Sequence, residues 1–520
     1  MDLLELPSEL IAHVVEYLDD VDLFSARLSH RAVERACFSH FGQRYFRKRG
    51  FLVISPSLDV LQSIAEHPEL RKYTQHVWFN PDCYTFIRPL CCPEHHEDYA
   101  GGGGRDCGPP DLYDLYAARI SAQHTVRSKQ FEAYVLHQRD HEKLMITGQL
   151  ESRLARAFKH LPNLMTVGMR RSEDYAPYGW RMLKDAIGQD PRVIGPIGYR
   201  PGITMSGPTR LFTATVRALA GIGRNLERLY TDAIELENIS TKVLSQRTMT
   251  AALSSIKYVE LNIVKGWLTR ISDDSDESDA ADSDASDFDR LRDSDHYGHG
   301  LVRFFQATPD LLELGLQIFP DQRQSHLVAP TARDPSSWRG SYPFMAFQRL
   351  AAEVTLPHLT RIKLEKLTTT SKILSNFLRP CSKHMTSLKL RDVRLLPSKD
   401  EPRPWETMFT FLATQCPRLE YILFYHLMHD QGGISYTKDR PEAPPAETDV
   451  DDYIENPIWP VHAGQAVFAK YDHITMQISG RDEVKAKLEE IAEEHWYHRP
   501  LFSYAMDESV WHTDTSDEEW

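Results

Sequence analysis

One spacing of apolar residues recurs along the chain and constrains its fold more than any other feature. Seven times, a residue suited to a core is followed by two more, three and five positions later. The sets are Leu164/Val167/Met169, Leu226/Leu229/Thr231, Ile256/Val259/Leu261, Leu311/Leu314/Leu316, Leu359/Ile362/Leu364, Met385/Leu388/Leu390 and Leu419/Ile422/Phe424. The last two positions of each set would share one face of a β-strand. Helical patterns lie between several sets, at 208–221, 300–308, 371–379 and 405–414. The spacing predicts an α/β fold of parallel strands alternating with helices, with a non-repetitive α/β domain as the alternative.

The N-terminal segment has the pattern of three short amphipathic helices. Pro7 suits a first helical turn, where its missing N–H has no intrahelical partner. The first helix has apolar residues at helical spacing: Leu10, Ile11, Val14, Val15 and Leu18. Asp20 or Asp22 can cap the second helix, and the third carries apolar residues from Val33 to Phe46. A bundle this small buries little core, so its remaining apolar surface is expected to bind a partner.

This segment resembles an F-box, the module that docks a protein onto the Skp adaptor of a cullin–RING ubiquitin ligase. The residues that carry the resemblance are Leu6, Pro7, Glu9, Leu10, Ile11, Val14, Tyr17, Leu18, Asp22, Leu23, Leu28 and Ser29. Many F-boxes have a Trp in the third helix, where this sequence offers Val33, Phe38 and Phe41. The resemblance implies an adaptor-binding set of Leu6, Pro7, Leu10, Ile11, Val14, Tyr17, Leu18, Leu23 and Leu28. An ordinary N-terminal helical cap on a larger fold is the alternative.

Behind this segment, the recurring sets resemble the irregular leucine-rich-repeat solenoid of fungal-type F-box proteins. The resemblance implies a substrate-recognition subunit of an SCF-type E3 ubiquitin ligase, which holds the Skp adaptor at its N-terminus and a protein client on its repeats. Such a subunit positions the client and catalyses no ubiquitin transfer itself. Two other hypotheses stay open: a repeat scaffold whose adaptor contact serves something other than degradation, and a zinc-binding protein that uses residues 83–107.

The patterns and the composition between them predict a domain order. The F-box spans 1–50, and a connecting region with an irregular loop at 83–110 spans 51–160. The repeat domain spans 161–430 and carries an insertion at 272–296, where eleven acidic residues predict disorder through mutual repulsion. A Pro- and acid-rich loop at 431–460, a strand–helix cap at 461–505 and an acidic tail at 506–520 follow.

Composition bounds the partners and the compartment. A formal charge of −14 argues against nucleic acid or an anionic membrane as the main partner. No apolar run reaches the roughly eighteen residues of a transmembrane helix. Asp2 and Glu5 stand where a secretory signal would carry basic residues. Seven unevenly spaced cysteines fit the reducing cytoplasm or nucleus.

Two segments offer residues for chemistry outside the core pattern. Cys91, His95 and Cys107 are of the types that bind zinc, but the adjacent Cys-Cys and His-His pairs around them favour a loop without metal, so no cofactor is predicted. A possible phosphorylation segment has acidic residues close downstream of each serine: Ser275, Ser278, Ser283 and Ser286. A solvated spacer is the alternative there. Hydrolase, kinase and dinucleotide motifs are missing from the sequence, which predicts that the chain is not an enzyme.

Overall fold

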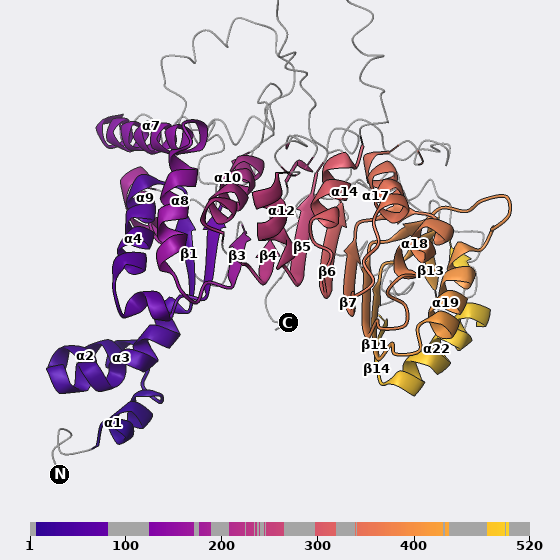
Figure 1. Ribbon diagram of the computed structural model, residues 1–520, viewed down its shortest axis with the longest axis horizontal. Helices are drawn as coiled ribbons and strands as arrows, with labels where there is room; N and C mark the ends of the chain where they lie inside the picture. Colours follow the sequence, from indigo (N-terminus) through magenta and orange to yellow (C-terminus); the bar gives the residue numbers. More distant parts are fainter. Residues whose placement is uncertain are drawn as a thin grey trace, which may run out of the picture. The chain divides into compact units, whose positions relative to one another are not determined.

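The computed structural model describes residues 7–81, 124–170, 176–188, 207–264 except 224, 233, 237–238, 240–243 and 245, and then 297–318, 339, 341–429, 432–435, 476–494 and 496–498. The chain divides into two compact units, Met1–Ile203 with Arg210–Leu226 (unit 1) and Thr204–Thr209 with Glu227–Trp520 (unit 2). Helices and strands alternate in both (Figure 1). The predicted irregular loop at 83–110, the acidic insertion at 272–296 and the tail at 506–520 lie outside the described residues.

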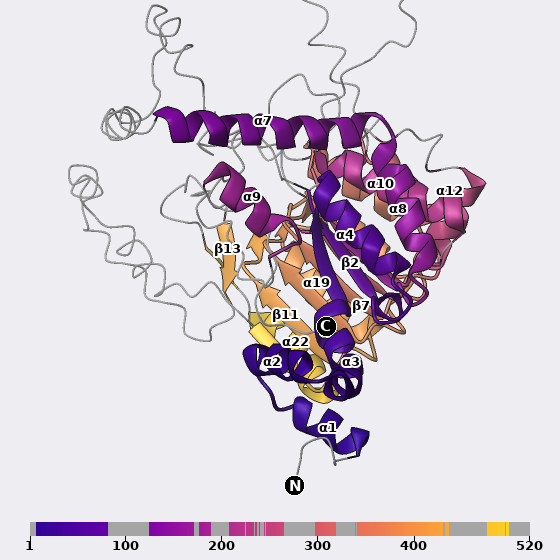
Figure 2. The same cartoon turned by 90° about the vertical axis from the view of Figure 1, so that its left-hand side faces the viewer.

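Unit 1 begins with a bundle of helices and continues into parallel strands. The bundle consists of α1 (Ser8–Val15), α2 (Asp20–Ser29) and α3 (Arg31–Phe46), which lie together in both views (Figures 1 and 2). The strands are β1 (Lys48–Leu52), β2 (His76–Asn80) and β3 (Thr166–Met169), paired in parallel in that order. Around them lie α4 (Ser55–Glu66), the short helix η2 (Leu70–Lys72), α7 (His124–Ile146), α8 (Gln149–His160), α9 (Trp180–Ile187) and most of α10 (Gly207–Ile222).

Parallel strands begin at β1, well before residue 161, where the repeat domain was predicted to start. The strand expected near 73–79 is β2, and it pairs with β1, which directly follows α3. Close packing fixes this first pair, because a Cβ atom on Gly50 would lie 2.2 Å from the Trp78 ring. Any larger residue at position 50 would push Trp78 out of the core of unit 1.

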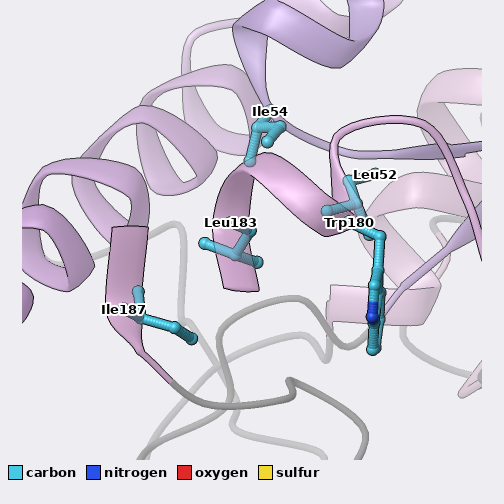
Figure 3. Packing of buried hydrophobic residues seen from close by; sticks show 5 residues of the cluster. All are labelled: Leu52, Ile54, Trp180, Leu183 and Ile187. Carbon is cyan, nitrogen blue, oxygen red and sulfur yellow. The ribbon is translucent and has the colours of Figure 1, made fainter. Parts of the chain in front are cut away.

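Helix α9 closes one side of β1. Tyr178 donates its backbone N–H to the Gly50 carbonyl at 2.8 Å and accepts from Leu52 N–H at 3.2 Å. The helix that follows packs its apolar face against the end of β1, in a buried cluster of Leu52, Ile54, Trp180, Leu183 and Ile187 (Figure 3). Residues 176–188 are thus tied to β1 by both backbone and side chains.

Helix α7 is tied to the start of α4 by polar contacts. Asp140 accepts from the backbone N–H and the hydroxyl of Ser55, both at 2.6 Å, and so satisfies an open donor at the N-terminus of α4. His141 Nδ1 lies 2.9 Å from the Val53 carbonyl and must donate to it. Burial lowers the pKa of His141 below its ordinary 6.5, although the hydrogen bond to Val53 and the nearby Glu142 and Asp140 oppose the shift.

The lowered pKa gives a testable pH dependence. A group whose pKa is lower when folded contributes its full stability above its unfolded pKa and loses it as the pH falls through the folded pKa. We therefore expect His141→Asn, which keeps a donor for Val53 but does not titrate, to flatten the loss of thermal stability between about pH 7.5 and about pH 5.5. Equal pH dependence in the wild type and the variant would contradict a neutral His141 in the folded chain.

The sheet of unit 2 contains the strand residues of six of the seven recurring sets. Its parallel strands, in spatial order, are β4 (Arg228–Tyr230), β5 (Tyr258–Ile263), β6 (Glu313–Ile318), β7 (Arg361–Glu365), β9 (Ser387–Arg391) and β11 (Tyr421–Tyr425). The helices between and after them include α12 (Arg247–Ser254), α14 (His299–Gln306), α17 (Tyr342–Glu353), α18 (Ser371–Leu378) and α19 (Pro404–Gln415). Helices α14, α17, α18 and α19 pack one against the next along the sheet (Figure 1).

The strand positions of the predicted sets are buried and in register. Six of the seven sets contribute their second residue to one row across the parallel strands of unit 2: Leu229, Val259, Leu314, Ile362, Leu388 and Ile422. In the remaining set, Val167 lies in β3 of unit 1 and pairs with Val77 of β2. The third residues form the next row from Leu261 to Phe424, and the first residues are buried as well. The predicted parallel strand–helix repeat is confirmed, and the arrangement agrees with a leucine-rich-repeat-like fold.

Two features of unit 2 differ from a uniform repeat. The strand expected at 472–478 is described as β14 (Met476–Ser479), which pairs antiparallel with β11 and ends the sheet before α22 (Arg481–Glu494). A second sheet follows the ends of the main strands, in the order β15 (Trp496–His498), β13 (Gly432–Ser435), β12 (Met428–His429), β10 (Arg394–Leu395) and β8 (Thr368–Thr369). The described residues of the predicted loop at 431–460 thus form a strand, β13.

The turns into the second sheet repeat an unusual backbone conformation. Lys366, Asp392 and His426 have φ values of 53°, 53° and 50° at equivalent positions after β7, β9 and β11. Asp392 accepts from His426 Nδ1 at 2.6 Å, which links two neighbouring turns. Three residues without glycine's freedom adopt the left-handed region here because the turn from one sheet to the next demands it.

Candidate protein-docking surface

The N-terminal bundle has its own core. The Pro7 carbonyl accepts from the N–H groups of Leu10 and Ile11 at 3.0 and 3.1 Å and so starts α1. Helix α2 is capped by Asp19, rather than by the predicted Asp20 or Asp22, through a 2.8 Å bond from Asp22 N–H. The buried residues of the bundle come from all three helices: Ile11, Val15, Leu23, Val33 and Cys37.

Polar contacts fix the turn between α1 and α2 against α3. Arg44 donates to the Leu18 carbonyl at 2.8 Å and pairs with Asp20 at 2.7 Å. The Tyr45 hydroxyl also donates to Asp20. Burial, together with this hydrogen bond, raises the pKa of Tyr45 to about 12, so the hydroxyl remains a donor at neutral pH. The orientation of α1 and α2 is therefore set by α3.

Two stripes of apolar side chains on this bundle remain exposed. Leu10, Val14 and Tyr17 lie at helical spacing along α1 and the turn that follows it. Val21, Phe24 and Leu28 form the corresponding stripe on α2. Exposed apolar side chains scattered singly are ordinary, whereas several at helical spacing on each of two short helices can mark a protein-binding surface. We call these six residues the α1–α2 surface.

The predicted adaptor-binding residues fall into two groups. Pro7, Leu10, Val14, Tyr17 and Leu28 are exposed, and Leu18 is half-buried against the core of the bundle. Ile11 and Leu23, which the resemblance places in the adaptor-binding set, are both buried. These two can support the surface but cannot contact a partner directly. Leu6 lies outside the described residues.

The α1–α2 surface also contains residues that sequence reasoning missed. Val21 and Phe24 are exposed and precede Leu28 by seven and four residues, which places all three on one helix face and was the available signal. In place of a third-helix Trp, Phe38 is half-buried and Phe41 is buried beneath Arg27, whose guanidinium lies 3.3 Å from the Phe41 ring centroid. A cation over an aromatic ring thus occupies this corner of the bundle.

The other candidate residues cannot be placed. Cys91, His95, Cys107 and the serines at 275, 278, 283 and 286 lie outside the described residues. Within the part of the chain that the structure describes, no group of three His, Cys, Asp or Glu side chains is arranged to hold a metal ion.

Burial raises the pKa of Cys381 and of Cys416 to about 12 each, so these thiols stay protonated at neutral pH and are poor nucleophiles. Of the helices described, none has the length and apolar character to cross a bilayer.

Comparison with known proteins finds distant structural similarity only. No protein-family model and no curated protein matches the sequence. Among solved structures, the chain is similar to the leucine-rich repeat-containing protein LegL7 from Legionella pneumophila, with 11% identity and a TM-score of 0.23. The similarity covers 53% of this chain and 69% of that protein. At this level the match adds nothing to the fold described above.

Proposed function

We propose that this chain is the substrate-recognition subunit of an SCF-type cullin–RING E3 ubiquitin ligase. In this proposal the α1–α2 surface binds a Skp-type adaptor and, through it, the cullin and its RING protein, while the repeats of unit 2 bind a protein client. The chain needs no cofactor and catalyses no transfer, and it acts in the cytoplasm or nucleus. Bringing the client close to the recruited ligase raises the effective concentration of the acceptor lysines.

One observation carries the proposal: a helical bundle that buries its own core while two consecutive helices, both packed on α3, each expose a stripe of apolar side chains. These side chains occupy the same segment that resembles an F-box in sequence. The repeated strands of unit 2 support the second half, because a regular row of outward side chains on a parallel sheet suits protein recognition. Neither observation favours the zinc-binding alternative.

Affinity capture of the full chain from its own cells tests the proposal. We expect a Skp-type adaptor and a cullin to co-purify in near-equal amounts with the chain, and a ligase-trapping fusion to enrich ubiquitylated clients. Clients that persist longer in cells lacking the chain would establish degradation. Capture of adaptor with unchanged client turnover would favour the scaffold alternative, and a chain that purifies without adaptor would contradict the proposal.

A further inference from the structure

Tyr17 differs from Tyr45, the other tyrosine of the N-terminal bundle. The Tyr45 hydroxyl donates to Asp20, and its ring packs on that of Phe41 at a centroid distance of 5.1 Å. Tyr17 is 78% exposed in the turn between α1 and α2, where its ring has an edge contact with the His13 ring at 5.4 Å. Its hydroxyl makes no hydrogen bond within the part of the chain that the structure describes. The phenol oxygen of Tyr17 is therefore accessible to an enzyme.

Local contacts hold the backbone around Tyr17. The N–H groups of Glu16, Tyr17 and Leu18 each donate to the carbonyl three residues earlier, at 3.3, 3.1 and 3.2 Å. Helix α1 has eight residues, and a helix this short is unstable without packing. Leu18 ties the turn to α3, because its carbonyl accepts from Arg44 at 2.8 Å. Opening the turn at Tyr17 costs less free energy than unfolding the bundle, so an enzyme can bind this segment in an extended conformation.

The residues around Tyr17 in the sequence are acidic. Four exposed carboxylates lie within five residues of it: Glu16, Asp19, Asp20 and Asp22. The sequence contains no Lys or Arg before Arg27. A protein kinase whose peptide-binding site is basic would recognise a tyrosine in this context through charge-assisted contacts to the flanking carboxylates. Exposure and acidic flanks thus coincide at one hydroxyl.

A phosphate on Tyr17 would oppose docking at the α1–α2 surface, to which Tyr17 belongs. The cations at this turn already have carboxylate partners, since Arg44 pairs with Asp20 at 2.7 Å and His13 Nδ1 lies 3.4 Å from Glu16. A phosphate adds a charge of about −1.5 to −2 beside these carboxylates. In a complex it would have to leave water for an apolar contact, and this desolvation is unfavourable.

We propose that Tyr17 is a phosphorylation site and that its phosphate releases the chain from the partner of the α1–α2 surface. In the reaction, the Tyr17 oxygen forms a bond to the γ-phosphorus of ATP, the bond between that phosphorus and ADP breaks, and the phenolic proton passes to a base of the kinase. The identity of the partner as a Skp-type adaptor rests on the proposed function, whereas the modification itself does not.

Titration of the purified adaptor with the full chain that carries phosphotyrosine at position 17 tests the effect of the phosphate. We expect an affinity at least about tenfold lower than that of the unmodified chain. The matched control carries phosphotyrosine at position 425, an exposed tyrosine on β11 of unit 2, and should bind the adaptor as the unmodified chain does. Unchanged affinity after modification at Tyr17, or equal losses in both modified chains, would overturn the inference.

Capture of the full chain from its own cells, after inhibition of tyrosine phosphatases, tests whether the modification occurs. We expect peptide mass spectrometry to find phosphate on Tyr17 in the adaptor-free fraction and not in the adaptor-bound fraction. Inhibition should lower the captured adaptor for the wild type but not for Tyr17→Phe, which has no hydroxyl to modify. Tyr17 without phosphate in both fractions, or with equal phosphate in both, would overturn the inference. Failure of the unmodified chain to bind the adaptor would count against the proposed function instead, because phosphate on Tyr17 would still be measurable.

Discussion

Replacing Leu10 and Leu28 together by Asp should abolish binding of the Skp-type adaptor to the full chain. The two side chains are 50% and 88% exposed, so the folded bundle loses little when they change. In a complex, two carboxylates would be buried in an apolar contact without partners, which costs several kcal/mol. We expect a fall in affinity of at least about a hundredfold, measured by titration of the purified adaptor.

The control for this variant uses exposed apolar residues elsewhere in unit 1. Leu136 and Ile146 on α7 are 67% and 69% exposed, so Leu136→Asp with Ile146→Asp adds the same charge without touching the α1–α2 surface. This control should bind the adaptor as the wild type does. Unchanged binding by the Leu10/Leu28 variant, or equal losses in both variants, would show that the adaptor binds elsewhere or not at all.

The second large effect concerns the core of the repeats. Leu388 is fully buried in β9, between its register partners Ile362 and Ile422. Leu388→Ala removes buried methyl groups from a site bounded by a strand on either side, where the structure can relax only in part. We expect it to lower the free energy of unfolding by roughly 2–5 kcal/mol, measured by denaturant titration.

The position of the damage is as informative as its size. In a repeat fold each unit contacts mainly its neighbours, so amide protection should fall in β7, β9 and β11 and persist in β1, β2 and β3. Ser387→Ala, the adjacent outward residue on the same strand, should change stability by less than about 0.5 kcal/mol. A cost below about 1 kcal/mol for Leu388→Ala would contradict its place in the core.

Much of unit 2 could be predicted because its strands repeat one physical rule. Two positions per strand face the helices, so the spacing of Leu359, Ile362 and Leu364 recurs wherever a strand enters the same core. β1 could not be predicted in this way, because Phe51 and Leu52 belong to a continuous apolar run without the three-and-five-residue spacing of the repeated sets. A strand that is covered on both faces buries consecutive residues, so its sequence shows no alternation of apolar and polar side chains.

The second sheet could not be predicted from the same rule. Its strands β8, β10 and β12 follow Lys366, Asp392 and His426, which take positive φ without being glycine. Only glycine, and to a lesser degree Asn and Asp, signals such a turn in a sequence. Two-residue strands such as Thr368–Thr369 carry too few side chains to show a period.

The sequence predicts that the N-terminal bundle exposes apolar side chains, but it does not predict which of them face outward. The sequence places apolar residues at both Leu10 and Ile11, and either could face the bundle. Packing against Val33 and Cys37 on α3 turns Ile11 inward and leaves Leu10 outside. That choice depends on contacts between helices, which no single helix encodes.

Hydroxyl-radical footprinting of the purified full chain, with and without a saturating amount of Skp-type adaptor, tests the proposed adaptor contact most directly. Leu10, Tyr17, Phe24 and Leu28 are exposed in the free chain and should react readily. Upon binding, we expect these four side chains to become protected while Leu136 and Ile146 on α7 react as before. Undiminished labelling of the α1–α2 surface in the presence of adaptor would contradict the proposed function.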